Sequence, residues 1–248
     1  MKIVTYNGQG KENWSAALKL EPDVLLFQEA TPPPENIKSR TDWRPTRNKW
    51  GTAVYVKQGT ISRLEIKHDY EWLPGWLVGM DIEGSLNPLG SNRKLRVFSL
   101  HTPPSTISGI SYPNTVQQML KVIAQNRGDT DFVIGGDFNL LSLGERHELE
   151  AKDAGKPLTA TRQEKDIHKQ LADLGLMNCW QVKNPGMSLG RTLRYRSKES
   201  SPAFHCDGLF VPETWKHVLA SADILETADW AARSDHNPVV VTFSQSTE

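Results

Sequence analysis

The sequence predicts an α/β fold with mixed β-sheets, for three reasons. Short apolar runs rich in β-branched residues recur along the whole chain, as buried strands do. Amphipathic helical patterns alternate with these runs in the middle of the chain, which is typical of α/β proteins. Closely spaced runs between Trp50 and Leu100 indicate antiparallel hairpins, so parallel and antiparallel pairs are expected together. Because no internal repeat or linker is evident, we expect residues 1–248 to form one domain.

The expected strands are apolar runs bounded by turn-forming or charged residues. They begin near the first residue and continue almost to the last, which indicates sheets built from the whole chain. In chain order they are Ile3–Tyr6, Val24–Gln28, Thr52–Val56, Leu77–Ile82, Leu95–Leu100, Phe132–Gly135, Gly208–Val211 and Val239–Phe243.

Three helices are expected where apolar residues recur at helical spacing. The first contains Trp14 and Ala17 and ends before Pro22, because proline cannot continue a helix. The apolar stripes of the other two predict faces that pack on the core. These stripes are Val116, Met119, Leu120 and Ile123 in the second helix, and Ile167, Leu171 and Leu174, after a capping box of Thr161 and Glu164, in the third.

The overall charge is balanced, with 29 Lys and Arg against 29 Asp and Glu and a sequence pI of about 7.1. The chain therefore lacks a global positive field, and an anionic substrate has to be attracted locally. We find no signal-peptide pattern and no run near the roughly 18 apolar residues that cross a membrane. Cys179 and Cys206 form neither a disulfide framework nor a zinc-ligand spacing. We expect a monomeric, cytoplasmic protein without membrane contact.

Polar side chains stand at the ends of several expected strands. In the clearest case, Asp137 and Asn139 follow two glycines that end the apolar run Phe132–Ile134. Glycine lets the backbone turn sharply there, or lets a ligand approach it closely. In open α/β sheets, ligands bind where such strand ends converge. The other groups in comparable positions are Asn7, Gln28, Glu29, His101, Asp207, Asp235 and His236.

Several carboxylates brought together in this way predict a cation site. They would repel one another and raise each other's pKa unless a cation neutralised them. Carboxylate and amide oxygens suit Mg²⁺ or Mn²⁺, which also bind phosphate oxygens. A histidine beside them supplies acid–base capacity near neutral pH. The pattern therefore indicates divalent-metal-dependent phosphate-ester chemistry.

With these motifs in this order, the chain resembles the endonuclease/exonuclease/phosphatase superfamily, which includes DNase I-like and exonuclease III-like nucleases. The resemblance runs from Tyr6-Asn7 to Ser234–Val239, and its specific motifs are Gly-Asp-x-Asn and Ser-Asp-His-x-Pro-Val. It implies a four-layer α/β/β/α sandwich, in which two packed mixed β-sheets are flanked by helices and the site lies at one end.

The resemblance also implies roles for single residues. Glu29 resembles the principal metal ligand, Asp235 resembles a second carboxylate on the metal side, and Asn7 resembles the residue that helps to hold the metal or the phosphate. Asp137 and Asn139 resemble the pair that positions the attacking water and the scissile phosphate.

Two histidines and a further acid complete the implied site. His236 resembles the histidine that contacts the phosphate or takes a proton from water, and Asp207 resembles the acid that orients it. His101 resembles the second histidine of DNase I-like members, which protonates the leaving oxygen or stabilises the developing charge. Those members pair it with a glutamate before the strand that corresponds to Thr52–Val56. Here only Arg47-Asn48-Lys49 stands there, so that part of the arrangement is different.

A cluster of basic residues before Asp207 is the candidate substrate-binding segment. Clustered arginines with an aromatic residue suit contacts to a phosphate backbone and to bases. A solvated basic loop is the alternative interpretation of the same residues. The cluster consists of Arg191, Arg194, Arg196 and Lys198 with Tyr195 among them, and the residues expected to bind substrate are Arg191, Arg194, Tyr195 and Arg196.

The first functional hypothesis is a Mg²⁺- or Mn²⁺-dependent nuclease that cleaves DNA by in-line attack of water and leaves a 3′-hydroxyl and a 5′-phosphate. One alternative is a phosphatase or phosphodiesterase that acts on an inositol phosphate, a phospholipid or a small nucleotide. The inositol 5-phosphatase pattern Cys-Asp-Arg is not present at Cys206-Asp207, because Gly208 replaces the arginine. A further alternative is a non-catalytic binding module with the same fold.

Overall fold

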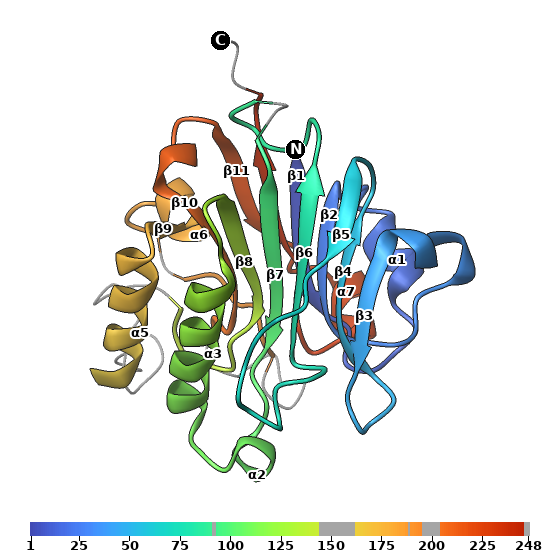
Figure 1. The fold of residues 1–248 in the computed structure, drawn as a ribbon, viewed down its shortest axis with the longest axis vertical. Helices are drawn as coiled ribbons and strands as arrows, with labels where there is room; N and C mark the ends of the chain where they lie inside the picture. Colours follow the sequence, from blue (N-terminus) through green and yellow to red (C-terminus); the bar gives the residue numbers. More distant parts are fainter. Residues whose placement is uncertain (91–92, 144–161, 188, 195–203, 246–248) are drawn as a thin grey trace.

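Two six-stranded β-sheets pack face to face in the computed structural model, and helices cover their outer faces (Figure 1). The structure describes residues 1–90, 93–143, 162–187, 189–194 and 204–245. Each sheet contains both parallel and antiparallel pairs, as in β1–β2 and β1–β12 of the first sheet and β7–β8 and β8–β10 of the second. The predicted four-layer sandwich with two mixed sheets is confirmed.

The strands of both sheets are drawn from the whole length of the chain. In spatial order, the first sheet contains β11 (Leu219–Ile224), β12 (Val239–Phe243), β1 (Lys2–Asn7), β2 (Val24–Ala30), β4 (Gly51–Val56) and β3 (Thr41–Pro45). The second contains β5 (Thr60–Arg63), β6 (Leu77–Glu83), β7 (Leu95–His101), β8 (Asp131–Asp137), β10 (Asp207–Pro212) and β9 (Leu176–Asn178).

The helices of the described residues differ widely in length. The longest are α3 (Tyr112–Asn126) and α5 (Arg162–Asp173), which lie side by side on the second sheet (Figure 1). The others are α1 (Trp14–Leu18), α2 (Ser105–Ser108), α6 (Cys179–Lys183) and α7 (Ala228–Arg233), with 3-10 helices η1 (Glu35–Arg40) and η3 (Glu213–Trp215).

The core follows from the two-residue alternation of the strands. On β1, Ile3 packs into the cluster between the two sheets, whereas Val4 packs beneath α1 and α7. On β7, Val97 faces the same central cluster and Phe98 packs beneath α3. All four side chains are completely buried. Burial on both faces explains why these strands are apolar runs in the sequence.

The eight expected strands and the three expected helices are all present. Four further strands, β3, β5, β9 and β11, were not predicted from the sequence. β9 has three residues, and β5 is mostly exposed, so neither needs a long apolar run. Thr161 of the expected capping box lies outside the described residues, whereas Glu164 accepts a hydrogen bond from the Leu141 amide at 3.0 Å.

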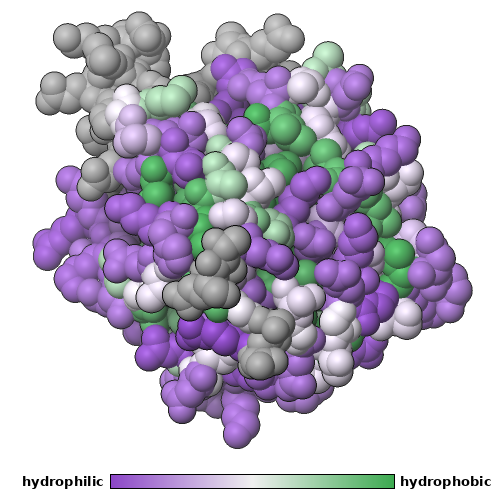
Figure 2. Space-filling model, turned by 90° about the horizontal axis from the view of Figure 1, so that it is seen from above, coloured by the Kyte–Doolittle hydropathy of each residue, from purple (hydrophilic) through white to green (hydrophobic). Residues whose placement is uncertain are grey.

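The two ends of the sandwich differ in what they present. The chain begins at one end of β1, and the view of that end shows mostly hydrophilic side chains with smaller hydrophobic areas among them (Figure 2). The carboxyl ends of β1, β2 and β8 lie at the opposite end, where the candidate residues gather.

Cys179 and Cys206 are buried free thiols. No helix within the described ranges combines the length and the apolar content needed to span a bilayer.

Candidate active site

Strand register brings the candidate residues to one edge of the sandwich. β1 and β2 run parallel with Asn7 opposite Gln28, so Glu29 comes one residue later beside Asn7. β7 and β8 also run parallel, and His101 lies opposite Asp137. β10 is antiparallel to β8 and begins with Asp207 opposite Asp137. Asp137 is therefore the point at which contributions from both sheets meet.

The glycines before Asp137 permit close packing of the backbone. At Gly136 φ is +152°, and a Cβ would lie 1.8 Å from the Leu100 carbonyl oxygen. At Gly135, a Cβ would lie 2.5 Å from Leu26 Cδ1 of the other sheet. Neither position can hold a side chain without displacing its neighbours. The glycines thus allow neighbouring segments of the protein to pack closely against β8, whereas the sequence suggested only a sharp turn or a nearby ligand.

An amide holds two of the carboxylates together. Asn7 Nδ2 donates to Asp137 Oδ2 at 2.9 Å and to Glu29 Oε1 at 3.2 Å. Its Oδ1 accepts a hydrogen bond from the Gln9 amide at 2.9 Å. Asn7 is thus a bridge between the two carboxylates, and its Oδ1 keeps a second lone pair.

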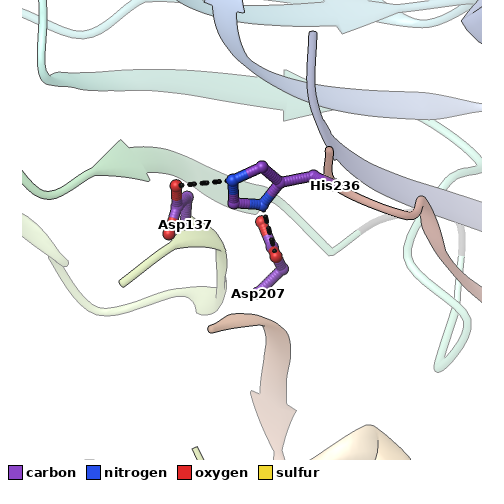
Figure 3. Close-up of side chains that lie close together, drawn as sticks. All are labelled: Asp137, Asp207 and His236. Atoms are coloured by element: carbon purple, nitrogen blue, oxygen red, sulfur yellow. Dashed lines mark hydrogen bonds and ion pairs between the residues drawn. The ribbon is translucent and has the colours of Figure 1, made fainter. Parts of the chain in front are cut away.

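His236 lies between two aspartates (Figure 3). Its Nδ1 lies 2.8 Å from Asp207 Oδ2, within hydrogen-bond distance, and its Nε2 lies 3.7 Å from Asp137 Oδ2. All three side chains are buried. Because the acid at Nδ1 fixes the ring, Nε2 is aimed at the centre of the site, which is the orienting arrangement expected for Asp207.

The second histidine has a different environment. His101 Nε2 lies 3.7 Å from Asp137 Oδ2 and 3.8 Å from Glu29 Oε1, beyond hydrogen-bond distance. No carboxylate among the described residues pairs with its Nδ1. The Trp50 and Trp76 rings lie against the imidazole instead.

Local backbone conformation also shapes the site. Glu29 and Asn139 have φ values of +45° and +51°, in the left-handed region that few residues other than glycine adopt. At Asn139 this conformation is held by two hydrogen bonds, from its amide to Asp137 Oδ1 at 2.9 Å and from its Nδ2 to the Thr102 carbonyl at 3.0 Å. Such strain commonly accompanies functional positions.

Burial and mutual charge shift the pKa values of the site. Burial raises the pKa of Glu29, and burial together with the charge of Asp207 raises the pKa of Asp137. Burial alone would lower the pKa of His236, but the carboxylates of Asp207 and Asp137 outweigh it and raise the pKa to about 10. Burial lowers the pKa of His101 to about 4. The two histidines therefore differ in charge at neutral pH.

The donor set fits a hard divalent cation. Asp137, Asp207 and His236 each offer an atom within 4.8 Å of the other two, but the hydrogen bond between Asp207 and His236 already occupies two of these atoms. Glu29 is partly exposed, and Asp235 is near enough for its charge to raise the pKa of Glu29. These oxygens match the preference of Mg²⁺ or Mn²⁺. The carboxylate side of the site, around Glu29, is therefore the better cation position.

The basic segment is only partly described. Tyr195 and Arg196 lie outside the described residues. Arg191 forms an ion pair with Glu226, with 3.5 Å between Nη1 and Oε1. Arg194 is 6% exposed, and its guanidinium donates to Asn237 Oδ1 and to the Ser234 carbonyl. Arg194 thus braces the segment that carries His236 and does not face a substrate groove.

Several supporting residues were not singled out from the sequence. Thr192 Oγ1 accepts hydrogen bonds from the amides of Cys206 and Asp207, at 2.8 and 3.0 Å, and so positions the acid beside His236. Ser234 Oγ donates to the Asn7 carbonyl at 2.8 Å and accepts from the His236 amide at 3.0 Å. Ser234 belongs to the motif before His236, which was a usable signal, whereas nothing local marks Thr192.

A cavity of about 480 Å³ lies beside the site. Asn139 forms part of its wall, and the remaining lining is mainly apolar. Its other lining residues are Tyr112, Pro113, Leu140, Leu141, Glu164, Leu193, Phe204 and Cys206.

No family model matches the chain, and no curated protein matches it in sequence. Solved structures resemble it over nearly the whole length. The 3′ phosphatase NExo from Neisseria, bound to a product DNA hairpin, has a TM-score of 0.71 at 14% identity, covering 98% of this chain and 99% of that one. An AP endonuclease from Archaeoglobus fulgidus has a TM-score of 0.68 at 15% identity, with the same coverage.

A third similar structure is the endonuclease domain of TRAS1, a telomere-specific non-LTR retrotransposon. Its TM-score is 0.65 at 16% identity, covering 98% of each chain. These likenesses show that the chain shares the fold of these solved structures, two packed mixed sheets flanked by helices, which is the fold that the sequence motifs implied.

Proposed function

We propose that this protein is a divalent-metal-dependent nuclease that hydrolyses DNA and leaves a 3′-hydroxyl and a 5′-phosphate. The observation that carries the proposal is the convergence of Glu29, Asp137 and His236 at one edge of the sandwich. Acid, imidazole and amide groups from both sheets surround a single centre there. The fold neighbours that act on DNA support a nucleic-acid substrate, since their names describe nucleases and a 3′ phosphatase.

In this proposal each group has a distinct task. A cation held by Glu29 and Asp235 would polarise a phosphoryl oxygen. Asp137, whose pKa is raised, accepts a proton from the attacking water, and the protonated His236 donates a hydrogen bond to the phosphate. Water attacks phosphorus in line with the 3′ oxygen, which leaves and takes up a proton. Asn139, which is hydrogen-bonded to Asp137 through its amide, helps to orient the phosphate.

The apolar cavity favours a nucleotide over an inositol phosphate. Its volume of about 480 Å³ and its apolar wall suit a sugar or a base attached to the scissile phosphate. A polyphosphorylated inositol would need several cationic side chains, and the described residues that line the cavity include none. Arg191 remains a candidate contact to the phosphate backbone, together with Tyr195 and Arg196.

The proposal also covers the organisation of the protein. We propose that residues 1–248 form one domain that acts as a monomer in the cytoplasm. Pairing of β1 with β12 joins the two ends of the chain in one sheet, which supports a single domain. Two buried free thiols fit a reducing compartment. Light scattering coupled to gel filtration tests the oligomeric state, and fractionation of cells tests the location.

The activity is tested with Mg²⁺ and with Mn²⁺ on a panel of phosphate esters. The panel contains supercoiled plasmid, abasic duplex DNA, a DNA hairpin with a 3′-phosphate, RNA, an inositol phosphate and a phospholipid. We expect nicked plasmid, no product with EDTA, and at least about a 10²-fold loss in His236→Gln. His217→Gln, at an exposed histidine outside the site, is the matched control and should keep full activity.

Other outcomes would contradict the nuclease. Product from the inositol phosphate or the phospholipid alone would support the phosphatase alternative. Tight binding of DNA without turnover under any metal condition would support the binding module. Release of phosphate from the 3′ end alone would be consistent with the proposed site but would show that the protein hydrolyses phosphate monoesters and not diesters.

A further inference from the structure

His101 differs from His236 in what holds its ring. His236 Nδ1 lies 2.8 Å from an aspartate oxygen, whereas His101 Nδ1 is buried without a hydrogen-bond partner among the described residues. The His101 side chain is 5% exposed, so bulk water does not satisfy this nitrogen. Something other than an acid must therefore fix the orientation of the ring.

Two tryptophan rings contact the imidazole of His101. The centroid of the Trp76 ring is 4.8 Å from that of the imidazole, and the Trp50 centroid is 5.5 Å from it. The two indoles also pack edge to face on each other, with centroids 5.3 Å apart and an interplanar angle of 89°. The His101 amide donates to the Trp76 carbonyl at 2.8 Å. The two indole rings therefore lie next to each other and both contact the imidazole.

Trp50 is itself held in place. The Thr46 amide and the Thr46 hydroxyl both donate to the Trp50 carbonyl at 2.7 Å and close the hairpin between β3 and β4. On another side, a Cβ at Gly10 would lie 3.2 Å from Trp50 Cδ1, so the loop after β1 packs against the indole. Trp50 is partly exposed, with its backbone carbonyl held by Thr46 and one edge of its indole packed against the loop at Gly10.

The environment also selects which ring nitrogen carries the proton. Nδ1 has no acceptor among the described residues, whereas Nε2 faces two carboxylate oxygens, whose negative charge favours an N–H on that side of the ring. The proton therefore belongs on Nε2. That nitrogen lies 3.7 and 3.8 Å from the carboxylate oxygens of Asp137 and Glu29, beyond hydrogen-bond distance, so its proton is not committed to either of them.

We propose that Trp50 is a positioning residue that, together with Trp76, replaces an acidic partner and aims the Nε2–H of His101 at the scissile phosphate. This inference rests on the proposed function for its kinetic consequences. It assigns a task to a side chain that no sequence motif marks, at the position where the chain departs from the DNase I-like pairing of histidine with glutamate.

The test is a double-mutant cycle measured on the DNA substrate that the protein cleaves best. The variants are Trp50→Ala, His101→Ala and the combination, with Trp50→Phe as the conservative replacement. Trp72→Ala is the matched control, because Trp72 is partly buried and stacks on Tyr70 away from His101. Thermal unfolding of each variant establishes that it is folded before kcat and KM are compared.

We expect Trp50→Ala to lower kcat about tenfold with KM within about twofold, since a misplaced group slows chemistry more than binding. Trp50→Phe should recover most of the loss, and Trp72→Ala should match the wild type. In the His101→Ala background, Trp50→Ala should cost less than about twofold more, because a residue that acts through His101 has nothing left to position.

An equal loss in both backgrounds, or a loss confined to KM, would overturn the inference and indicate that Trp50 contacts the substrate directly. A second measurement does not need activity. Long-range ¹H–¹⁵N NMR of metal-free protein should find the His101 proton on Nε2, and a mixture of tautomers in Trp50→Ala. A proton on Nδ1 in the wild type would refute the positioning argument, whereas an inactive wild type with the proton on Nε2 would refute only the nuclease.

Discussion

Replacing Asp207 by asparagine is the sharpest perturbation of the site. The substitution keeps the size of the side chain and removes its charge, while His236 stays buried. At present Asp207 Oδ2 lies 2.8 Å from His236 Nδ1, and the Asp207 carboxylate is the largest influence that raises the pKa of His236. Without that charge, burial should dominate.

The magnitude follows from the shift of His236. A rise from 6.5 to about 10 corresponds to about 5 kcal/mol in favour of the imidazolium, at roughly 1.4 kcal/mol per tenfold change in proton affinity. Removal of one adjacent opposite charge typically lowers a pKa by about 1 to 3 pH units. We therefore expect the pKa of His236 in Asp207→Asn to fall by about 2 to 3 pH units in metal-free protein.

The assay is an NMR titration of the histidine side chains in EDTA, with Asp223→Asn, an exposed acid on β11, as the control. Activity should fall by about 10² to 10⁴-fold in Asp207→Asn, because the amide no longer stabilises a charged imidazole. A His236 pKa within one unit of the wild type would refute the reasoning, and so would near-normal turnover in a folded variant.

Four further predictions test the electrostatics and the packing. Because the pKa of His236 is raised to about 10 in the folded protein, its protonation stabilises the fold fully below about pH 6.5, and this contribution is lost as the pH rises through about 10. The free energy of unfolding, measured with urea in EDTA, should therefore fall by roughly 1.4 kcal/mol per pH unit in that interval. If His236 is the group responsible, the free energy of unfolding of His236→Gln should not change with pH there. Gly136→Ala should lower the free energy of unfolding by more than about 3 kcal/mol in a denaturant titration. Gly175→Ala, also at positive φ but with no atom within 4 Å of the added Cβ, should lower it by about 1 kcal/mol. Equal losses would disprove the argument that a Cβ at Gly136 clashes with its neighbours. Arg194→Met should lower stability by about 2 to 3 kcal/mol, and an increase in KM at unchanged stability would instead make Arg194 a substrate contact. Mg²⁺ should raise the melting temperature of the wild type, with a smaller rise in Glu29→Gln; an equal rise in both would place the cation elsewhere.

The sequence alone is sufficient to predict the core strands and many of the residues of the proposed site. Apolar runs such as Val24–Gln28 are buried on both faces, so their composition alone identifies them as strands. β11 was not predicted, because Leu219–Ile224 alternates small and polar residues and derives its strand conformation from pairing with β12. Tertiary pairing outweighs local preference at such sheet edges.

The features of the site that could not be predicted from the sequence are contacts between segments far apart in the chain. The sequence placed Asn7 at a strand end, but its donation to Asp137, 130 positions away, depends on how the two sheets pack. Arg194 belongs to a basic cluster, and only the fold reveals that its guanidinium is buried against the segment that carries His236. The contact of two indole rings with His101 has no local pattern, because Trp50 and Trp76 come from separate loops.

The pairing of β1 with β12 has a consequence during protein synthesis. Lys2 lies opposite Thr242, so β1 can pair early with β2 but gains its second neighbour, β12, only once residues 239–243 have been synthesised. His236 lies shortly before β12 and enters the site together with it. A nascent or truncated chain would therefore carry Glu29 and Asp137 without the imidazole between the sheets. On the proposed function, hydrolytic competence should therefore appear only once β12 has paired with β1.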